Sequence, residues 1–155
     1  MRVEAAVLIK ADAATVFRFI SAPENESRWQ EGAVWTRVTT PGPVRLGSEM
    51  EHLGRWLGMR IPTHAVVTVF DPNSVFGYDI TTSGLSNAPS RMRYSLERVP
   101  DGTRLTLSNE ARLPRFVLPF TPLLQRSVQR MFDRDVDRLR AAIEAEKAAR
   151  DSATV

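Results

Sequence analysis

The spacing of hydrophobic residues changes its period three times along the chain, and each period predicts a different kind of element. Residues 2–10 are extended and aliphatic, and residues 12–20 place apolar side chains at helical spacing behind an aspartate suited to cap the first turn. Pro23 disfavours helical geometry at the residue before it, so this helix should end close to that point. A second short helical turn, 23–28, leads to Trp29, which we expect to be a structural residue.

From residue 33 onward, polar and apolar residues alternate, and this pattern predicts strands. Six alternating segments are separated by Gly, Pro, Asn and Asp turn signals: 33–40, 48–57, 59–70, 75–82, 91–99 and 103–113. Connections this short favour antiparallel pairing, and the segment 2–10 adds a seventh strand.

After Pro122 the period returns to that of an α-helix, and the apolar stripe continues to about residue 148. A twisted antiparallel sheet needs one face covered, and this helix is the longest element that could cover it. We therefore predict an α+β fold, a curved seven-stranded antiparallel sheet wrapped around a long C-terminal helix, with two short helices after the first strand. A single domain, 1–148, and a frayed tail, 149–155, are expected. Because side chains cannot fill all the space between such a curved sheet and a single helix, we also expect an internal cavity.

Composition narrows the function classes. The formal net charge is +3, and the nineteen arginines are spread along the chain among eighteen acidic residues, which argues against nucleic-acid binding. The absence of cysteine excludes disulfides, thiolate nucleophiles and zinc–thiolate sites. No apolar stretch has the length of a signal peptide core or a membrane span, so we expect a cytoplasmic protein.

An ordered set of short motifs adds a family resemblance. The motifs are ADAATVFRFI at 11–20, PEN at 23–25, RW at 28–29, FDP at 70–72 and GTRLTL at 102–107, followed by the amphipathic C-terminal helix. In this order they resemble the START-like superfamily, which includes polyketide cyclases and dehydratases, lipid-transfer domains and plant allergens. The resemblance covers nearly all of 1–148 and implies the helix-grip fold, in which the two short helices form a V. It implies no single activity, because carriers, enzymes and regulators share this scaffold.

Strand alternation predicts which side chains face the cavity, and the helical stripe adds two more. The expected ligand-binding residues are Met50, His52, Trp56, His64, Phe76, Tyr78, Met92, Tyr94, Asn109, Val128 and Phe132. In the segment 59–70 we place His64, Val66, Thr68 and Phe70 inward, although Val67 and Val69 are also apolar.

The two histidines are the sharpest part of this expectation. If the hairpin turns about Gly58, His52 and His64 face each other with Cβ atoms about 4.5–5.5 Å apart. Such a pair could transfer protons, supply half of a metal site, or only line a wet cavity. A metal would need a third ligand, and Glu49 and Glu51 have the wrong parity to face inward. We therefore expect no metal and no cofactor, and the sequence identifies no catalytic residue.

Three function classes remain open. The leading hypothesis is the binding of a hydrophobic or aromatic small molecule, lipid-like or polyketide-like, between the sheet and the C-terminal helix. The first alternative, implied by the resemblance, is a cyclase or dehydratase in which cavity His and Tyr residues transfer protons. The second is a partner-binding regulator that acts through the helix face bearing Arg126, Arg130, Arg134 and Arg138. The segment 83–91 is expected to form a mobile lid at the cavity entrance.

Overall fold

The structure is a computed structural model that describes residues 1–83 and 89–154. Its elements follow the predicted order: β1 (Arg2–Ile9), α1 (Ala13–Ile20), η1 (Pro23–Arg28), β2 (Ala33–Val38), β3 (Glu49–Trp56), β4 (Met59–Asp71), β5 (Val75–Ser83), β6 (Ser90–Val99), β7 (Gly102–Ala111), η2 (Arg115–Phe120) and α2 (Thr121–Ala153). The lid expected at 83–91 falls largely on residues 84–88, which lie outside the described residues.

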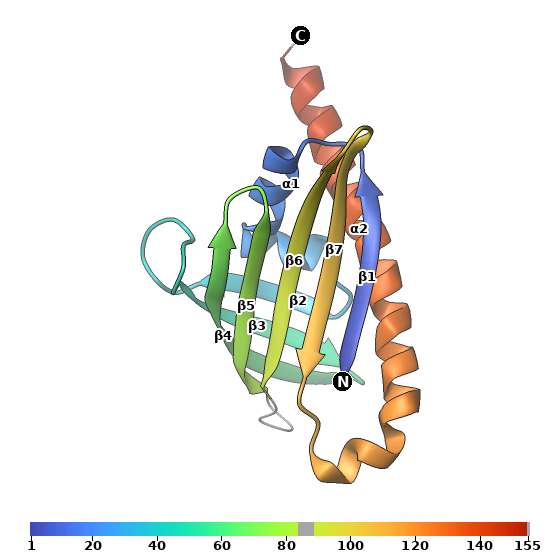
Figure 1. The fold of residues 1–155 in the computed structure, drawn as a ribbon. Coiled ribbons are helices and arrows are strands. Elements are labelled where there is room, and N and C mark those ends of the chain that lie inside the picture. The colour runs from blue at the N-terminus through green and yellow to red at the C-terminus, as the bar shows by residue number, and fades with distance from the viewer. Residues whose placement is uncertain (84–88, 155) are drawn as a thin grey trace.

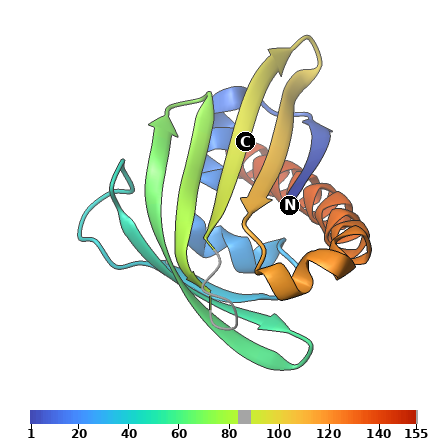
Figure 2. The same cartoon turned by 60° about the horizontal axis from the view of Figure 1, so that its bottom comes forward.

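All seven strands join one antiparallel sheet in the order β1-β7-β6-β5-β4-β3-β2. The sheet curls, so that β2 and β3 run crosswise to β6 and β7, and α2 lies along β1 (Figures 1 and 2). This arrangement confirms the predicted fold class. Within the described residues, no helix combines the length and the apolarity needed to cross a bilayer.

β1 is an edge strand, and α2 covers its free edge. Every second residue of β1 is buried, so the strand presents an apolar face to the core. On its outer edge the Gln129 Nε2 of α2 donates to the Glu4 carbonyl at 2.6 Å, and further along the helix the Glu144 carboxylate accepts from the Lys10 N–H at 3.0 Å. These side chains replace the missing neighbouring strand, which removes the exposed backbone groups that make edges prone to aggregation.

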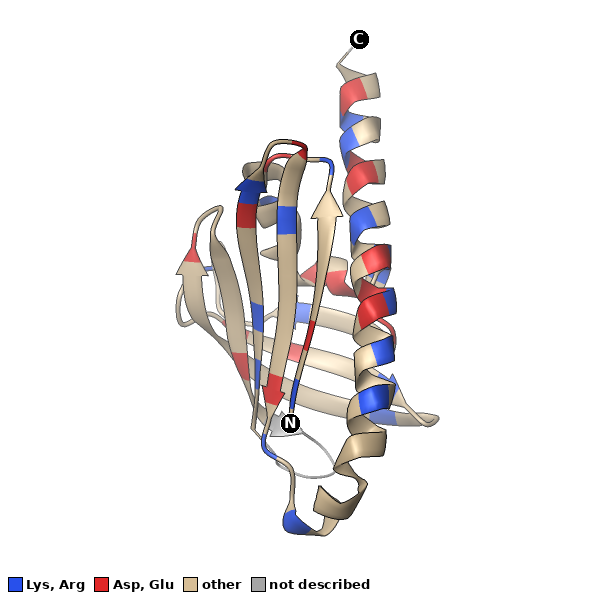
Figure 3. Cartoon of the chain, turned by 45° about the vertical axis from the view of Figure 1, so that its right-hand side comes forward, with Lys and Arg blue, Asp and Glu red and all other residues tan. Residues whose placement is uncertain are grey.

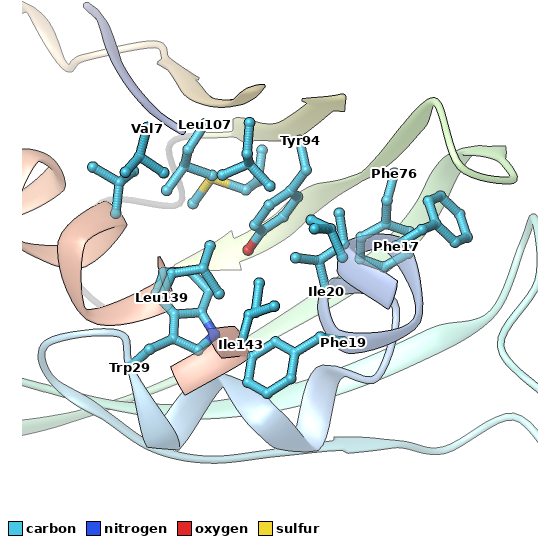
Figure 4. Close-up of a cluster of buried hydrophobic side chains, with 14 of the residues drawn as sticks. Val7, Phe17, Phe19, Ile20, Trp29, Phe76, Tyr94, Leu107, Leu139 and Ile143 are labelled. Atoms are coloured by element: carbon cyan, nitrogen blue, oxygen red, sulfur yellow. The ribbon is translucent and has the colours of Figure 1, made fainter. Parts of the chain in front are cut away.

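The core lies between the inner face of the sheet, α1 and the middle of α2. Trp29 is 3% exposed and packs edge-on against Tyr94, with ring centroids 6.3 Å apart. Figure 4 shows Trp29 next to Leu139 and Ile143 of α2. The expectation that Trp29 is structural is confirmed by this burial. α2 itself continues to Ala153, beyond the predicted helix end, and the division into a domain and a tail stays a prediction.

The β3–β4 hairpin has a two-residue turn. Leu57 and Gly58 both have positive φ, at 48° and 77°, as a type I′ turn requires, and Trp56 pairs with Met59. His52 is therefore opposite Thr63, and the predicted pairing of the two histidines is wrong.

The physical reason is a shift of one residue in register. A turn centred on Gly58 alone would align the histidines, whereas the two-residue turn moves β4 by one position and turns the side chains at 64–67 to the other face. Ala65 and Val67 are consequently buried, and His64 lies on the outer face with its Nε2 3.7 Å from Glu49. An irregularity between Val67 and Val69 then returns Phe70 to the core, as expected, where it packs against Phe17 and Phe76.

Candidate functional site

A buried carboxylate lies on the short helix η1. A 3₁₀-helix has three residues per turn, so Pro23, Glu26 and Trp29 follow one another on the same face. All three are buried, and Glu26 is only 3% exposed. Burying a carboxylate costs roughly several kcal/mol unless hydrogen-bond donors replace the water it loses. Glu26 therefore needs donors inside the fold.

Three strands supply those partners. The Tyr78 hydroxyl of β5 donates to Glu26 Oε1 at 2.8 Å, and the Thr36 hydroxyl of β2 donates to Oε2 at 2.8 Å. The Nδ1 of His52, on β3, lies 3.1 Å from the same Oε2. The carboxylate thus ties η1 to β2, β3 and β5 through a single group.

This environment fixes the proton position on the His52 ring. Nδ1 faces two oxygens, Glu26 Oε2 and, at 3.1 Å, Thr36 Oγ1, whose own proton is used on Glu26. Both oxygens call for a donor, so the neutral ring carries its proton on Nδ1. The lone pair is then on Nε2, which is buried and has no hydrogen-bond partner among the described residues. Nε2 therefore keeps an unused acceptor site.

The two buried tyrosines act as donors and not as bases. Burial, followed by the charge of Glu26, raises the pKa of Tyr78 well above its ordinary value. The same two causes raise the pKa of Tyr94. Both phenols consequently stay protonated at neutral pH.

A pocket of about 240 Å³ opens beside this cluster, between the sheet and α2. Its polar wall consists of Glu26, Thr36, His52 and Tyr78. Its apolar wall includes Ile61, Ile80, Met92 and Met131. The lining is completed by the loop 30–33, by the segment 53–56 with the exposed Trp56, and by Thr63. The pocket therefore presents one apolar side and one hydrogen-bonding side to a ligand.

A larger groove, of about 560 Å³, lies elsewhere and is chemically different. Charged residues line it, and they pair with one another: Arg2 with Glu110 at 3.3 Å, and Arg91 with Asp79 at 3.4 Å. The residues that line this groove include no buried polar atom without a partner, such as the His52 Nε2. We therefore regard the smaller pocket as the candidate site.

Comparison with known families agrees with this architecture. Residues 1–144 match the model of the family described as polyketide cyclase / dehydrase and lipid transport. The chain belongs to this family. No curated protein compared with it matches significantly.

Solved structures show the same fold at low sequence identity. TTHA0849 from Thermus thermophilus is 14% identical, with a TM-score of 0.78 over 94% of this chain and 99% of that one. A START superfamily protein from Mycobacterium smegmatis is 16% identical, with a TM-score of 0.75 over 93% and 97%. The Zhui aromatase/cyclase from a Streptomyces species is 14% identical, with a TM-score of 0.74 over 93% of each chain.

In this polyketide cyclase / dehydrase and lipid transport family member, the predicted site residues fall into separate groups. Those that line the pocket are His52, Trp56, Tyr78 and Met92. Those buried in the core outside the lining are Met50, Phe76, Tyr94 and Phe132. Asn109 and Val128 are half-buried outside the lining, and His64 faces outward. The ligand-binding role of the lining residues stays a prediction.

Glu26 and Thr36 were not predicted from the sequence, and the set of expected ligand-binding residues did not include Met131. Strand alternation points to no inward carboxylate, and the decisive one lies on η1. The spacing of three from Pro23 to Glu26 to Trp29 is the signal that could have found it. The described residues contain no group of three or more His, Cys, Asp or Glu that could hold a metal.

Asp135 supports the rim of the pocket from α2. It lies among the buried apolar residues of the helix, is 1% exposed, and accepts the backbone N–H of Glu31 at 2.9 Å. Burial raises the pKa of Asp135 to about 6, against the opposing effects of that hydrogen bond and of Arg138. The side chain thereby anchors the loop 30–33 to the helix.

We expect Asp135 to make stability fall as pH rises. Its pKa is about 6 in the folded state and near 3.8 in the unfolded state, so folding binds the proton more tightly and the free energy of unfolding falls between about pH 4 and pH 6. Asp135→Asn keeps an acceptor for Glu31 but cannot ionise. It should remove this decline and raise the free energy of unfolding at pH 7 by about 1–3 kcal/mol, measured by urea denaturation across pH. A variant less stable at pH 7, with the same pH dependence as the parent chain, would contradict this assignment.

Proposed function

We propose that the chain binds a compact hydrophobic or aromatic molecule that carries one polar group. The observation that supports this most is the buried, unpartnered Nε2 of His52, a residue that lines an otherwise largely apolar pocket. A buried polar atom without a partner costs about 1–3 kcal/mol, and a ligand donor placed there would recover much of it. The body of the ligand would pack against Ile80, Met92 and Met131.

The size of the pocket favours a small ligand. Pockets for drug-sized ligands span about 300–1,000 Å³, and this one holds about 240 Å³. One or two fused rings fit this space better than a long acyl chain does. The proposal therefore favours an aromatic or cyclised ligand over an extended lipid.

Affinity should depend on the polar contact. Burying about 200 Å² of apolar surface contributes roughly 5 kcal/mol, and association costs of about 4 kcal/mol or more offset most of it. The hydrogen bond to His52 then decides whether binding is measurable at micromolar concentrations.

Filling the pocket should abolish binding without unfolding the chain. We expect Met131→Trp to prevent the binding of 2-naphthol, a two-ring phenol whose hydroxyl can donate to Nε2, because the indole would occupy the apolar wall. Ala145→Trp, at an exposed position on the same helix, is the matched control and should bind as the parent chain does. Binding is followed by chemical-shift changes at pocket residues. Equal binding by both variants would place the ligand site elsewhere.

A second function, proton transfer at a carbon next to a carbonyl, is favoured by the Glu26–His52 arrangement. A carboxylate bonded to Nδ1 stabilises the positive charge that develops on the ring when Nε2 takes a proton. The enolate oxygen of the ligand would need a donor, and Tyr78 lies in the same wall; its one hydroxyl proton is donated to Glu26, so the hydroxyl would have to turn from Glu26 to the enolate. Under this proposal the pocket is an acid–base site of the cyclase or dehydratase type.

The two histidines provide an internal test of this second function. With 2-tetralone, a compact enolisable ketone, the protein should speed deuterium uptake from D₂O at the carbons beside the carbonyl. His52→Gln should lower the rate by about 10²-fold or more, as loss of a general base does, and His64→Gln should leave it unchanged. If both variants keep the parent rate, or if the parent shows none, the chain is a binding protein only.

A further inference from the structure

Six arginines gather in two segments that contain no acidic residue. Residues 111–132 carry Arg112, Arg115, Arg126 and Arg130, and residues 52–70 carry Arg55 and Arg60, without an Asp or Glu in either range. All six are exposed, and none forms a salt bridge with a described residue. Most other arginines are paired, such as Arg37 with Glu51 and Arg104 with Glu97. Most of the unpaired positive charge is therefore localised in these two segments.

Large apolar side chains project from the same two segments. From η2 and the first turn of α2 they are Phe116, Leu118, Phe120 and Leu123, which are 54–76% exposed. From the β3–β4 hairpin they are Trp56, Leu57 and Met59, which are 44–77% exposed. We call these two segments together the cationic apolar end.

Both parts of the cationic apolar end lie at the end of the molecule away from the C terminus. Figures 1 and 2 show η2 at the turn into α2, with the β3–β4 hairpin on the same side of the molecule. Figure 3 shows basic but no acidic positions on the first turns of α2. Because Trp56 also lines the pocket, a surface bound here would meet the pocket rim.

Leu57 indicates that the hairpin tip is selected for more than folding. Its φ of 48° is a left-handed conformation that Asn or Gly adopts at lower cost than leucine, and the side chain is 77% exposed. The residue thus carries both backbone strain and an exposed apolar side chain. Departures from local preference of this kind concentrate at functional sites.

We propose that the cationic apolar end docks onto an anionic lipid surface. Arginines flanking exposed Phe, Leu and Trp side chains are the composition of interfacial membrane-binding segments, in which the apolar groups enter the headgroup region and the cations meet lipid phosphates. The side chains project from convex tips, which a deformable bilayer accommodates. A second copy of the chain in a two-fold dimer would bring the same unpaired arginines face to face.

The helix arginines further along α2 are excluded from this surface. Arg134 pairs with Glu31 at 2.9 Å, and Arg138 lies 3.9 Å from Glu31 and from Asp135. The four-arginine face expected for a regulator is thus divided, with only Arg126 and Arg130 free to meet an external partner. The docking proposal does not depend on the identity of the pocket ligand.

Vesicle co-flotation of the full chain tests the proposal. The protein should bind vesicles of phosphatidylcholine with phosphatidylserine, bind weakly to phosphatidylcholine alone, and be released by high salt. Arg126→Gln with Arg130→Gln should weaken binding about 25-fold, at roughly fivefold for each arginine. Arg18→Gln with Arg98→Gln removes the same charge from exposed, unpaired arginines elsewhere and should weaken it far less. Equal weakening by the two pairs would overturn a localised surface.

Tryptophan fluorescence distinguishes docking from other binding. In a Trp35→Phe background Trp56 is the exposed tryptophan, and its emission should shift to the blue on anionic vesicles and be quenched by brominated lipid. Phe116→Ser with Leu123→Ser, both at exposed positions, should remove vesicle binding while the thermal unfolding midpoint is kept. Three results would each contradict the proposal: no binding to anionic vesicles, unchanged Trp56 emission, or a dimer that the double serine variant dissociates.

Discussion

The candidate site depends on one buried carboxylate and the three donors that satisfy it. Glu26 cannot stay inside the fold without Tyr78, Thr36 and His52, and each donor comes from a different strand. The strands supply the donors that the carboxylate needs, and the carboxylate in turn sets the orientation of the His52 imidazole. Removing one donor would leave part of a buried charge unsatisfied, which costs more than the net value of one hydrogen bond. The free Nε2 at the pocket wall follows from this constraint.

Much of the fold could be predicted because its determinants are local. Along β1, β6 and β7, apolar and polar residues alternate, and this alternation predicts which side chains are buried. The short, turn-rich connections between strands favour antiparallel pairing. The apolar stripe of α2 likewise specifies a helix long enough to cover the sheet. Neither inference needs knowledge of distant contacts.

The site was harder to predict because it depends on long-range contacts. His64 was predicted on the wrong face because changing the turn length by one residue moves the side chains that follow it to the opposite face of the sheet. The sequence around Gly58 is compatible with either turn length. Glu26 was missed because a polar hexapeptide such as PENESR is ordinarily a solvated turn. Only the folded chain brings donors from β2, β3 and β5 to it. Met131 joins the pocket for the same reason, since the curl of the sheet decides which part of α2 it meets.

The pocket and the cationic apolar end meet at Trp56, so ligand exchange and surface docking would share one rim. Both depend on the β3–β4 hairpin, whose base carries His52. At that base, Glu26 holds the His52 ring with its proton on Nδ1. The most direct measurement is the ¹⁵N spectrum of the histidine ring nitrogens at neutral pH, in the parent chain and in His64→Gln, which leaves a single histidine. We expect one fixed tautomer, with a protonated Nδ1 and an unprotonated Nε2. A proton on Nε2, or rapid averaging between the two tautomers, would contradict it.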